Sequence, residues 1–320
     1  MGIHQAERYD YREAMRIFLY ECICAGGLGR EVPASLRHQG HAMLEAIVWD
    51  FQRLGGIEVV TLFDEERRFA ESAASCNWTL VIAPEFDDLL RSRSQTVLDV
   101  GGRLLGSLPE AIHRTADKLE TARIWRRRGV THPRTEPACA DVAAPCVLKP
   151  RHGAGSQATF LVRDSRERES LWEAARKEWP HGDFIVQQYV VGQPASVALL
   201  IGKSRTIPLL PAWQHLSGDG RFHYEGGSLP LPEPLASRAV NLALQAVADI
   251  DGLRGYVGVD LVLGDGGDDY AIEINPRLTT SYLGLRRLCR QNLAELILRM
   301  ARGENIAPPT WHAGEVKFEA

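Results

Sequence analysis

The feature that most constrains the fold of this chain is a carboxylate inside an apolar segment. Asp260 lies within residues 257–263, which are predicted to form a strand, and a second predicted strand, residues 270–275, follows a short loop. Glu273 and Asn275 are two positions apart, so they point to the same face of that strand. If the two strands pair, Asp260 lies opposite them. Because buried carboxylates are rarely left unpaired, the pattern favours a Mg²⁺ site over the alternative, a polar strand face that meets solvent.

A second segment predicts phosphate binding. Lys149 ends a short apolar strand and is followed by residues 151–156, Arg-His-Gly-Ala-Gly-Ser. Glycines allow backbone N–H groups to approach phosphate oxygens, and a lysine adds a mobile positive charge. The segment is not a P-loop, because the lysine precedes the glycines. The alternative is an ordinary glycine-containing hairpin.

Lys118, directly after Asp117, begins a predicted basic helix that ends at Gly129. A cation is electrostatically unfavourable at a helix N-terminus, so its presence there suggests a role. The alternative is a solvated surface lysine, for which this placement costs little.

The first third of the chain alternates between strands and helices. Apolar runs at residues 16–24, 57–63 and 79–83 predict strands, with a fourth expected from residues 103–106, and residues 41–54 have helical spacing. Parallel strands need crossover connections, so the pattern predicts a small Rossmann-like α/β domain. A dinucleotide fingerprint is absent, because Val32 stands where its third glycine belongs. The rest of the chain, with hairpins between helices, predicts an α+β fold.

Composition excludes several classes of protein. The net charge of −4 provides no broad basic surface for nucleic acid or for a membrane, and no apolar run is long enough to span a bilayer. The opening residues do not form a signal peptide, so a cytoplasmic protein is expected. The six cysteines contain no Cys-x-x-Cys pair, which favours reduced thiols over disulfides or zinc. The oligomeric state stays open, a homodimer included.

In this order, the segments resemble the ATP-grasp family, with coverage of about residues 15–300. The resemblance rests on the conjunction of four motifs: Asp117-Lys118 with Gly129-Val-Thr-His-Pro, Val147-Leu-Lys-Pro with Gly-Ala-Gly-Ser, Val186-Gln-Gln-Tyr-Val-x-Gly, and Val259-Asp260 with Glu273-Ile-Asn-Pro-Arg277.

The resemblance implies an ATP-grasp fold with a Rossmann-like N-terminal domain, an ATP lid and a C-terminal metal-binding subdomain. The expected boundaries are a tail at 1–14, the Rossmann-like domain at 15–112, the lid at 113–191, the C-terminal subdomain at 192–310 and a tail at 311–320.

The resemblance also implies the site residues. Lys118 and Lys149 would contact the ATP phosphates, and Asp260, Glu273 and Asn275 would hold two Mg²⁺ ions, for which Mn²⁺ could substitute. Arg277 would act with Lys149 on the transferring phosphoryl group. The other expected contacts are the phosphate cover Gly153, Ala154, Gly155 and Ser156, the adenine hinge Gln187, Gln188, Tyr189 and Val190, and Gln193 on the ribose, because Pro194 replaces a glutamate that many relatives carry.

Three further stretches look like the branch of carboxylate–amine ligases that contains tyramine–L-glutamate ligase. They are Phe18-Leu-Tyr-Glu-Cys with Gly26-Gly27, Glu31 with Gly40-His-Ala-Met-Leu, and the run that begins at Asn275-Pro-Arg-Leu-Thr-Thr-Ser-Tyr. This resemblance implies amide formation between L-glutamate and a tyramine- or tyrosine-like amine through an acyl phosphate, as in the biosynthesis of methanofuran-type coenzymes.

The acceptor site is expected next to Arg277, Thr279, Thr280 and Ser281, although a hydroxyl-rich helix start is also an ordinary capping signal. A polar loop at 212–228 with Trp213, His215, His223 and Tyr224 could close over an aromatic amine, or these could be surface aromatics. Two other functions stay open: a phosphotransferase or carbamoyl-phosphate-type enzyme, and a non-catalytic nucleotide-binding protein.

Overall fold

The N-terminal part of the computed structural model, which describes residues 14–28 and 34–319, is a parallel sheet between helices. Its strands are parallel, as the alternation of strands and helices predicted, and their order is β2-β1-β3. The expected fourth strand is reduced to one bridge between Thr79 and Leu104. The elements are β1 (Met15–Glu21), α1 (Ala34–Gln52), β2 (Ile57–Val60), α2 (Phe69–Ser75), β3 (Trp78–Ile82) and α3 (Leu89–Asp99).

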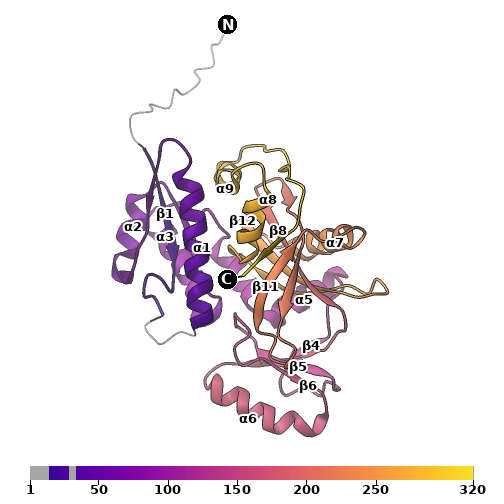
Figure 1. The fold of residues 1–320 in the computed structure, drawn as a ribbon. Helices are drawn as coiled ribbons and strands as arrows, with labels where there is room; N and C mark the ends of the chain where they lie inside the picture. The colour runs from indigo at the N-terminus through magenta and orange to yellow at the C-terminus, as the bar shows by residue number, and fades with distance from the viewer. Residues whose placement is uncertain (1–13, 29–33, 320) are drawn as a thin grey trace.

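A small antiparallel sheet forms the middle part of the chain and lies at the bottom of Figure 1. Its strand order is β4-β7-β5-β6, and one helix, α6, packs on it. The apolar side chains under α6 form a core of their own, so this part is a separately packed unit. The elements are β4 (Thr135–Pro137), β5 (Cys146–Pro150), β6 (Phe160–Val162), α6 (Arg168–Glu178) and β7 (Phe184–Gln188).

The C-terminal part is a seven-stranded antiparallel sheet with the order β13-β12-β8-β10-β11-β14, and β9 pairs with β8. Its strands are β8 (Gln193–Ile201), β9 (Thr206–Pro208), β10 (Ala212–Leu216), β11 (Tyr224–Leu229), β12 (Gly255–Leu263), β13 (Tyr270–Asn275) and β14 (Val316–Phe318). The remaining α-helices are α4 (Pro109–Ala116), α5 (Lys118–Arg128), α7 (Leu235–Val247), α8 (Ser281–Leu288) and α9 (Leu293–Ala301).

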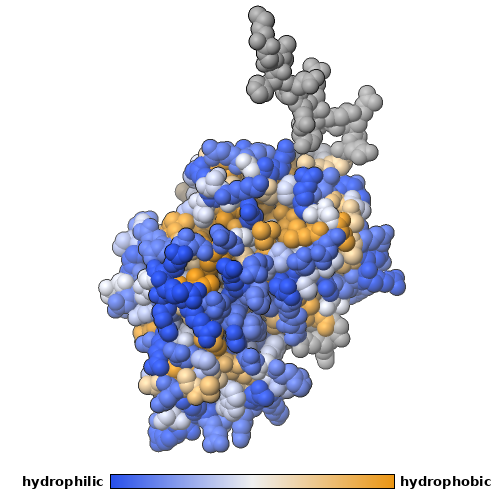
Figure 2. Space-filling view, turned by 180° about the vertical axis from the view of Figure 1, so that it is seen from behind, coloured by the Kyte–Doolittle hydropathy of each residue, from blue (hydrophilic) through white to orange (hydrophobic). Residues whose placement is uncertain are grey.

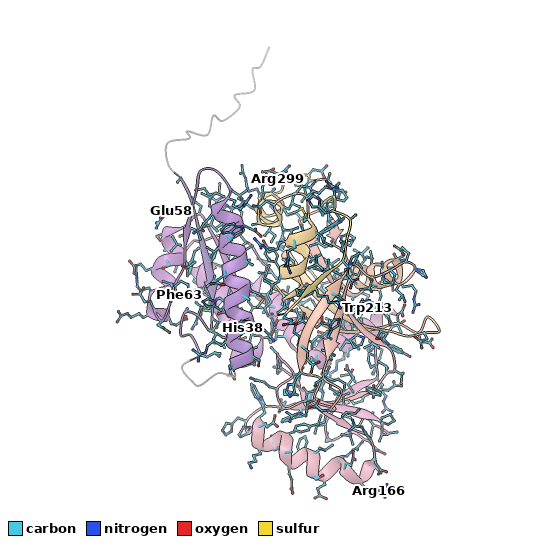
Figure 3. All side chains as sticks on the ribbon, in the orientation of Figure 1. His38, Glu58, Phe63, Arg166, Trp213 and Arg299 are labelled. Atoms are coloured by element: carbon cyan, nitrogen blue, oxygen red, sulfur yellow. The ribbon has the colours of Figure 1, made fainter. Side chains whose placement is uncertain are left out.

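The prediction of a loop at 212–228 is wrong. Most of this segment forms the hairpin of β10 and β11, inside the large sheet. Trp213 lies on a strand of that sheet (Figure 3). The glycines that suggested a loop have a different cause. A Cβ on Gly227 would come within 2.6 Å of the Phe318 ring, so a side chain there would displace β14.

The expected tail at 311–320 is also not a tail, because β14 pairs with β11 and the Phe318 ring is buried. The sequence signal was weak, since a three-residue strand shows little periodicity. The other expected tail, 1–14, falls almost entirely outside the described residues.

One continuous core joins the N-terminal sheet to the C-terminal part. Helix α1 lies between the two (Figure 1). A buried polar cluster fixes this junction: the Asp50 carboxylate on α1 accepts hydrogen bonds from Tyr282 Oη (2.6 Å) and from Arg286 Nε (2.8 Å) on α8. The N-terminal and C-terminal parts are therefore packed together through one core and one polar cluster.

The face seen in Figure 2 is mostly hydrophilic, with hydrophobic residues gathered between the hydrophilic ones. In the described part of the chain, no helix is long and apolar enough to cross a membrane. All six cysteines are free thiols, as expected from their spacing, and four of them are buried.

Replacing Asp50 with alanine tests the junction. The change leaves Tyr282 and Arg286 without their partner, so we expect the free energy of unfolding to fall by about 3 kcal/mol, the scale for breaking a mostly buried ion pair. Denaturant unfolding measures it. Glu110→Ala removes an exposed helix pair with Arg114 and is the control, expected to change stability by less than about 1 kcal/mol. A loss no larger for Asp50→Ala than for the control would contradict the role of this cluster.

Candidate active site

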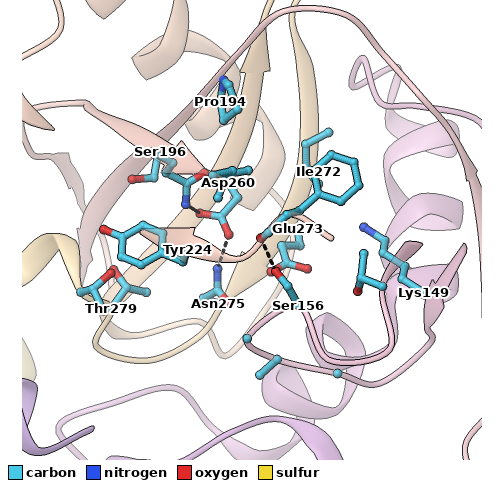
Figure 4. Close-up of a pocket in the computed structure, with 18 of the residues that line it drawn as sticks. Lys149, Ser156, Pro194, Ser196, Tyr224, Asp260, Ile272, Glu273, Asn275 and Thr279 are labelled. Carbon is cyan, nitrogen blue, oxygen red and sulfur yellow. Dashed lines mark hydrogen bonds between the residues drawn. The ribbon is translucent and has the colours of Figure 1, made fainter. Parts of the chain in front are cut away.

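A pocket lies where the three parts of the chain meet (Figure 4). Seventeen of the eighteen residues predicted from the sequence to form the site line it. They are Lys118, Lys149, Gly153, Ala154, Gly155, Ser156, Gln187, Gln188, Tyr189, Val190, Asp260, Glu273, Asn275, Arg277, Thr279, Thr280 and Ser281. The exception is Gln193, which is exposed outside the pocket, and Pro194 lines the wall in its place.

The two carboxylates face each other across neighbouring strands. Asp260 on β12 is the register partner of Glu273 on β13, and Gly258 is the partner of Asn275. A bulge after Asp260 places both Ile272 and Glu273 on the pocket wall, although they are adjacent in sequence. Asp260 accepts hydrogen bonds from Asn275 Nδ2 and from Gln214 Nε2, each at 2.9 Å. Gln214 comes from β10, which was not expected to be a strand.

The two carboxyl groups differ in the direction of their pKa shifts. Burial, followed by the negative charge of Glu273, raises the pKa of Asp260 to about 7. Burial alone would also raise the pKa of Glu273, but the ammonium groups of Lys118 and Lys149 outweigh it and lower that pKa. Burial lowers the pKa of Lys149 to about 8, although Glu273 opposes the shift. The pocket therefore brings buried carboxylate and ammonium groups of opposite charge together.

Lys118 begins α5, and two groups compensate its charge there. Its Nζ lies 3.2 Å from Glu273 Oε2 and donates to the carbonyl of Gly153 at 2.8 Å. Asp117 caps the same helix by accepting from the backbone N–H groups of Leu119 and Glu120. A helix N-terminus that is unfavourable for a cation is thus made tolerable by two carboxylates.

Asp117 also fixes the start of the glycine-containing loop. Its carboxylate accepts two hydrogen bonds from the Arg151 guanidinium, at 2.8 and 2.5 Å. Neither the helix cap nor the contact with Arg151 was predicted for Asp117, although an aspartate directly before a helix is a capping signal. The ion pair with Arg151 spans thirty-four positions, and no local pattern could predict it.

The glycine-containing loop at 151–156 is held from its other end by the β10–β11 hairpin. Ser156 Oγ donates to the carbonyl of Phe222 at 2.7 Å, and the Phe222 ring lies 6.4 Å from the ring of Tyr189. Gly155 has a φ of +66°, which a residue with a side chain rarely adopts. The loop, the hairpin tip and the hinge residue Tyr189 therefore meet at one point.

An apolar slot lies beside the hinge. Val147, Leu261 and Ile272 line it, and the buried Gln187 side chain is oriented by a hydrogen bond to Thr135 Oγ1 at 2.9 Å. Flat apolar walls with a polar strand at one edge suit a planar heterocycle. Residues 187–190 were predicted to lie here, but these walls could not be predicted, because apolar strand residues signal burial and not which cavity they face.

A positive group and hydroxyls lie beyond the carboxylates. Arg277 forms two hydrogen bonds with Glu85, at 2.8 and 3.1 Å, and the pair is mostly buried. Ser281 Oγ lies 2.7 Å from Tyr256 Oη and 2.9 Å from Thr279 Oγ1. These hydroxyls form a polar wall next to Arg277, rather than a simple helix cap.

The N-terminal part supplies a pocket wall whose residues were not predicted from the sequence to line the site. It includes Glu21 at the end of β1, Gly40 and Met43 on α1, and residues 82–84 after β3. The available signal was that the ends of parallel strands meet at one edge of a sheet, where ligands commonly bind. No spacing rule connects that edge to β12 and β13, which come more than 150 residues later in the chain.

Comparison with known proteins assigns the chain to a family. Residues 115–281 match the ATP-grasp domain, and residues 52–112 match the pre ATP-grasp 3 domain. The tyramine–L-glutamate ligase of Methanocaldococcus jannaschii is 29% identical over 259 residues, which cover 80% of this chain and 74% of that protein. The same enzyme of Methanocaldococcus fervens is 30% identical over 260 residues, with 80% and 78% covered.

Solved structures show the same fold. An ATP-grasp superfamily protein from Archaeoglobus fulgidus superposes with a TM-score of 0.73 at 25% identity, over 92% of this chain and 90% of that one. D-alanine–D-alanine ligase from Bacillus anthracis, solved with ATP, has a TM-score of 0.69 at 17% identity, with 91% and 98% covered. By its matched domains and its relatives, this chain belongs to the ATP-grasp family of ligases and is homologous to carboxylate–amine ligases.

Proposed function

We propose that the protein uses ATP to convert a carboxylate into an acyl phosphate, which an amine then attacks to form an amide. The observation that carries the proposal is the convergence of two lysines, an arginine and a facing carboxylate pair in one pocket. Phosphoryl transfer depends on positioning and charge neutralisation, and this set of groups supplies both.

The adenine would lie in the slot of Val147, Leu261 and Ile272, with its polar edge toward residues 187–190. The phosphates would then extend toward Lys149 and Lys118, under the loop at 151–156. Lys149 is suited to this because its ammonium group is buried and faces Glu273, so an anionic phosphate stabilises its charged form. Without Gln193 in the pocket, the ribose would contact the wall at Pro194 and Ser196.

The carboxylate pair fits Mg²⁺. Asp260 and Glu273 are hard oxygen ligands that face each other across two strands, and Asn275 adds an amide oxygen beside them. No group of three or more His, Cys, Asp or Glu gathers anywhere in the described residues. Mg²⁺ in ATP-dependent enzymes commonly has one or two carboxylate ligands plus phosphates, which these two residues match. Bound there, two such ions would neutralise the phosphate charge during transfer, a role that Mn²⁺ could also fill.

Arg277 would orient the transferring phosphoryl group against the substrate carboxylate. Its guanidinium is held by Glu85, so its direction is fixed before substrates bind. Preorganised charge of this kind stabilises a transition state without reorganisation. The acyl phosphate reacts readily with water, so the pocket must close over it. The loop at 151–156 is positioned to exclude water.

The separate core under α6 supports a lid that moves as a unit. We propose the division into a Rossmann-like domain at 15–112, a lid at 113–191 and a C-terminal metal-binding subdomain at 192–310. The packing refines it, because Trp125 of α5 donates to the carbonyl of Ala246 and belongs to the C-terminal core. The moving part would then begin near β4.

The similarity to tyramine–L-glutamate ligases leads us to propose L-glutamate as the acid and a tyramine- or tyrosine-like amine as the acceptor. Arg277 with Thr279, Thr280 and Ser281 suits an amino-acid carboxylate. Tyr224, on the strand next to them, offers an aromatic wall, whereas His215 and His223 are exposed and do not line the pocket.

The site is arranged around the terminal phosphoryl group, so catalysis should release ADP and phosphate. We expect nucleotide analysis after turnover to show ADP with no AMP above background. AMP and pyrophosphate as the main products would refute the acyl-phosphate route.

Glu273→Gln should reduce kcat by about 10²–10³-fold or more, the scale for losing one preorganised electrostatic contact. The change removes a charge from between Lys118 and the proposed metal, at nearly constant side-chain volume. Steady-state ADP release as a function of Mg²⁺ concentration measures it. Asp265→Asn, an exposed carboxylate in the loop between β12 and β13, is the control. Near-normal turnover with an unchanged Mg²⁺ requirement would contradict the assignment of β13.

Incubation with ATP, Mg²⁺ and L-glutamate plus tyramine should give a glutamyl amide detectable by mass. Tyrosine carries one more carboxylate, and a site that leaves this group unpaired should reject it, so one of the two amines is expected to be strongly preferred. No amide with either amine, together with rapid ADP release for another acid and amine, would remove this substrate pair and keep the ligase.

A further inference from the structure

Glu21 is a carboxylate in the pocket for which phosphoryl transfer has no use. It ends β1 and is 3% exposed, and it belongs to the pocket wall that the N-terminal part supplies. Its Oε2 accepts a hydrogen bond from the backbone N–H of Cys24 at 2.7 Å. Within the part of the chain that the structure describes, no lysine, arginine or histidine forms an ion pair with it.

The other charges of the pocket have partners. Lys118 lies against Glu273, with Lys149 close to the same carboxylate, and Arg277 is held by Glu85. Asp260 faces Glu273 at the proposed metal site. Glu21 is therefore the carboxylate of the lining that has neither the proposed metal nor an ion-pair partner among the described residues. The charge of Arg277 acts on it, but the Arg277 guanidinium is already paired with Glu85.

The backbone is built around this carboxylate. A Cβ on Gly40 of α1 would lie 2.6 Å from Glu21 Oε1 and 2.7 Å from its Cδ, so any side chain there would displace the group. Gly40 lies within a nineteen-residue helix, where glycine costs about 1 kcal/mol relative to alanine. The glycine thus keeps the carboxylate group of Glu21 in place against the helix.

We propose that Glu21 is the binding residue for a substrate ammonium group. A buried carboxylate is costly unless a cation compensates it, and a primary ammonium supplies both the charge and three hydrogen-bond donors. The inference rests on the proposed function, which requires an amine. The ammonium could come from either substrate: the α-ammonium of an amino-acid donor or the protonated acceptor amine.

Glu21→Gln tests the proposal because it keeps the acceptor for Cys24 and removes only the charge. Hydroxylamine, which is neutral, traps the acyl phosphate as a hydroxamate and reports activation without an acceptor. If Glu21 binds the donor, the KM for L-glutamate in this assay rises by about 10- to 100-fold, while that for glutarate, which lacks the amino group, does not change. If Glu21 binds the acceptor, hydroxamate formation is normal and the KM for tyramine rises by a similar factor.

Two further variants make the result specific. Gly40→Ala, which displaces the carboxylate, should raise the KM that rises in Glu21→Gln. Glu45→Gln removes an exposed carboxylate from the same helix and should leave every KM unchanged. An unaltered KM for ATP in Glu21→Gln shows that the variant is folded. The proposal would be overturned if the KM for glutamate and the KM for tyramine were each the same in Glu21→Gln as in the wild type. The ligase reaction would still stand.

Ligand-induced thermal stabilisation separates this proposal from the proposed function. If the wild type forms neither hydroxamate nor amide, the ligase chemistry fails. The ammonium site then stands if glutamate or tyramine stabilises the wild type and not Glu21→Gln. It falls if neither ligand stabilises the wild type.

Discussion

The pocket depends on two carboxylates that face each other across β12 and β13. Two buried carboxylates on paired strands repel each other unless a positive charge compensates them. Lys118, at the start of α5, supplies such a charge through its ion pair with Glu273. That contact ties the N-terminus of α5 to the large sheet, and through Gly153 to the glycine-containing loop. The position of three segments far apart in sequence thus follows from the charge balance at one pair of strands.

The sequence predicted the strands β12 and β13 because the period of a strand is short and local. Two positions separate Glu273 from Asn275, and both line the pocket. The lysine and glycine motif at 149–156 could also be predicted from local sequence, because a strand followed by glycines indicates a turn. Asp260 stood out because a carboxylate interrupted an apolar run. Each of these signals occupies a few consecutive residues, and the chain order that linked them indicated the family.

Contacts over long sequence separations could not be predicted in this way. The pairing of Arg277 with Glu85 spans nearly two hundred positions, and each residue alone is an ordinary charged side chain. The β10–β11 hairpin was mistaken for a loop because its glycines accommodate the Phe318 ring rather than a turn. Gln193 was chosen from its position in the chain, but alternation along β8 directs Pro194 to the pocket instead.

The hydrogen bond from Ser156 to Phe222 has a mechanical consequence. The glycine-containing loop at 151–156 is attached through it to the hairpin that also carries Gln214, the donor to Asp260. A movement of the loop away from the pocket must break this bond or move the hairpin tip, and with it the ring that lies beside Tyr189. Opening of the loop at 151–156 and displacement of the hairpin that carries Gln214 are consequently coupled through this one hydrogen bond.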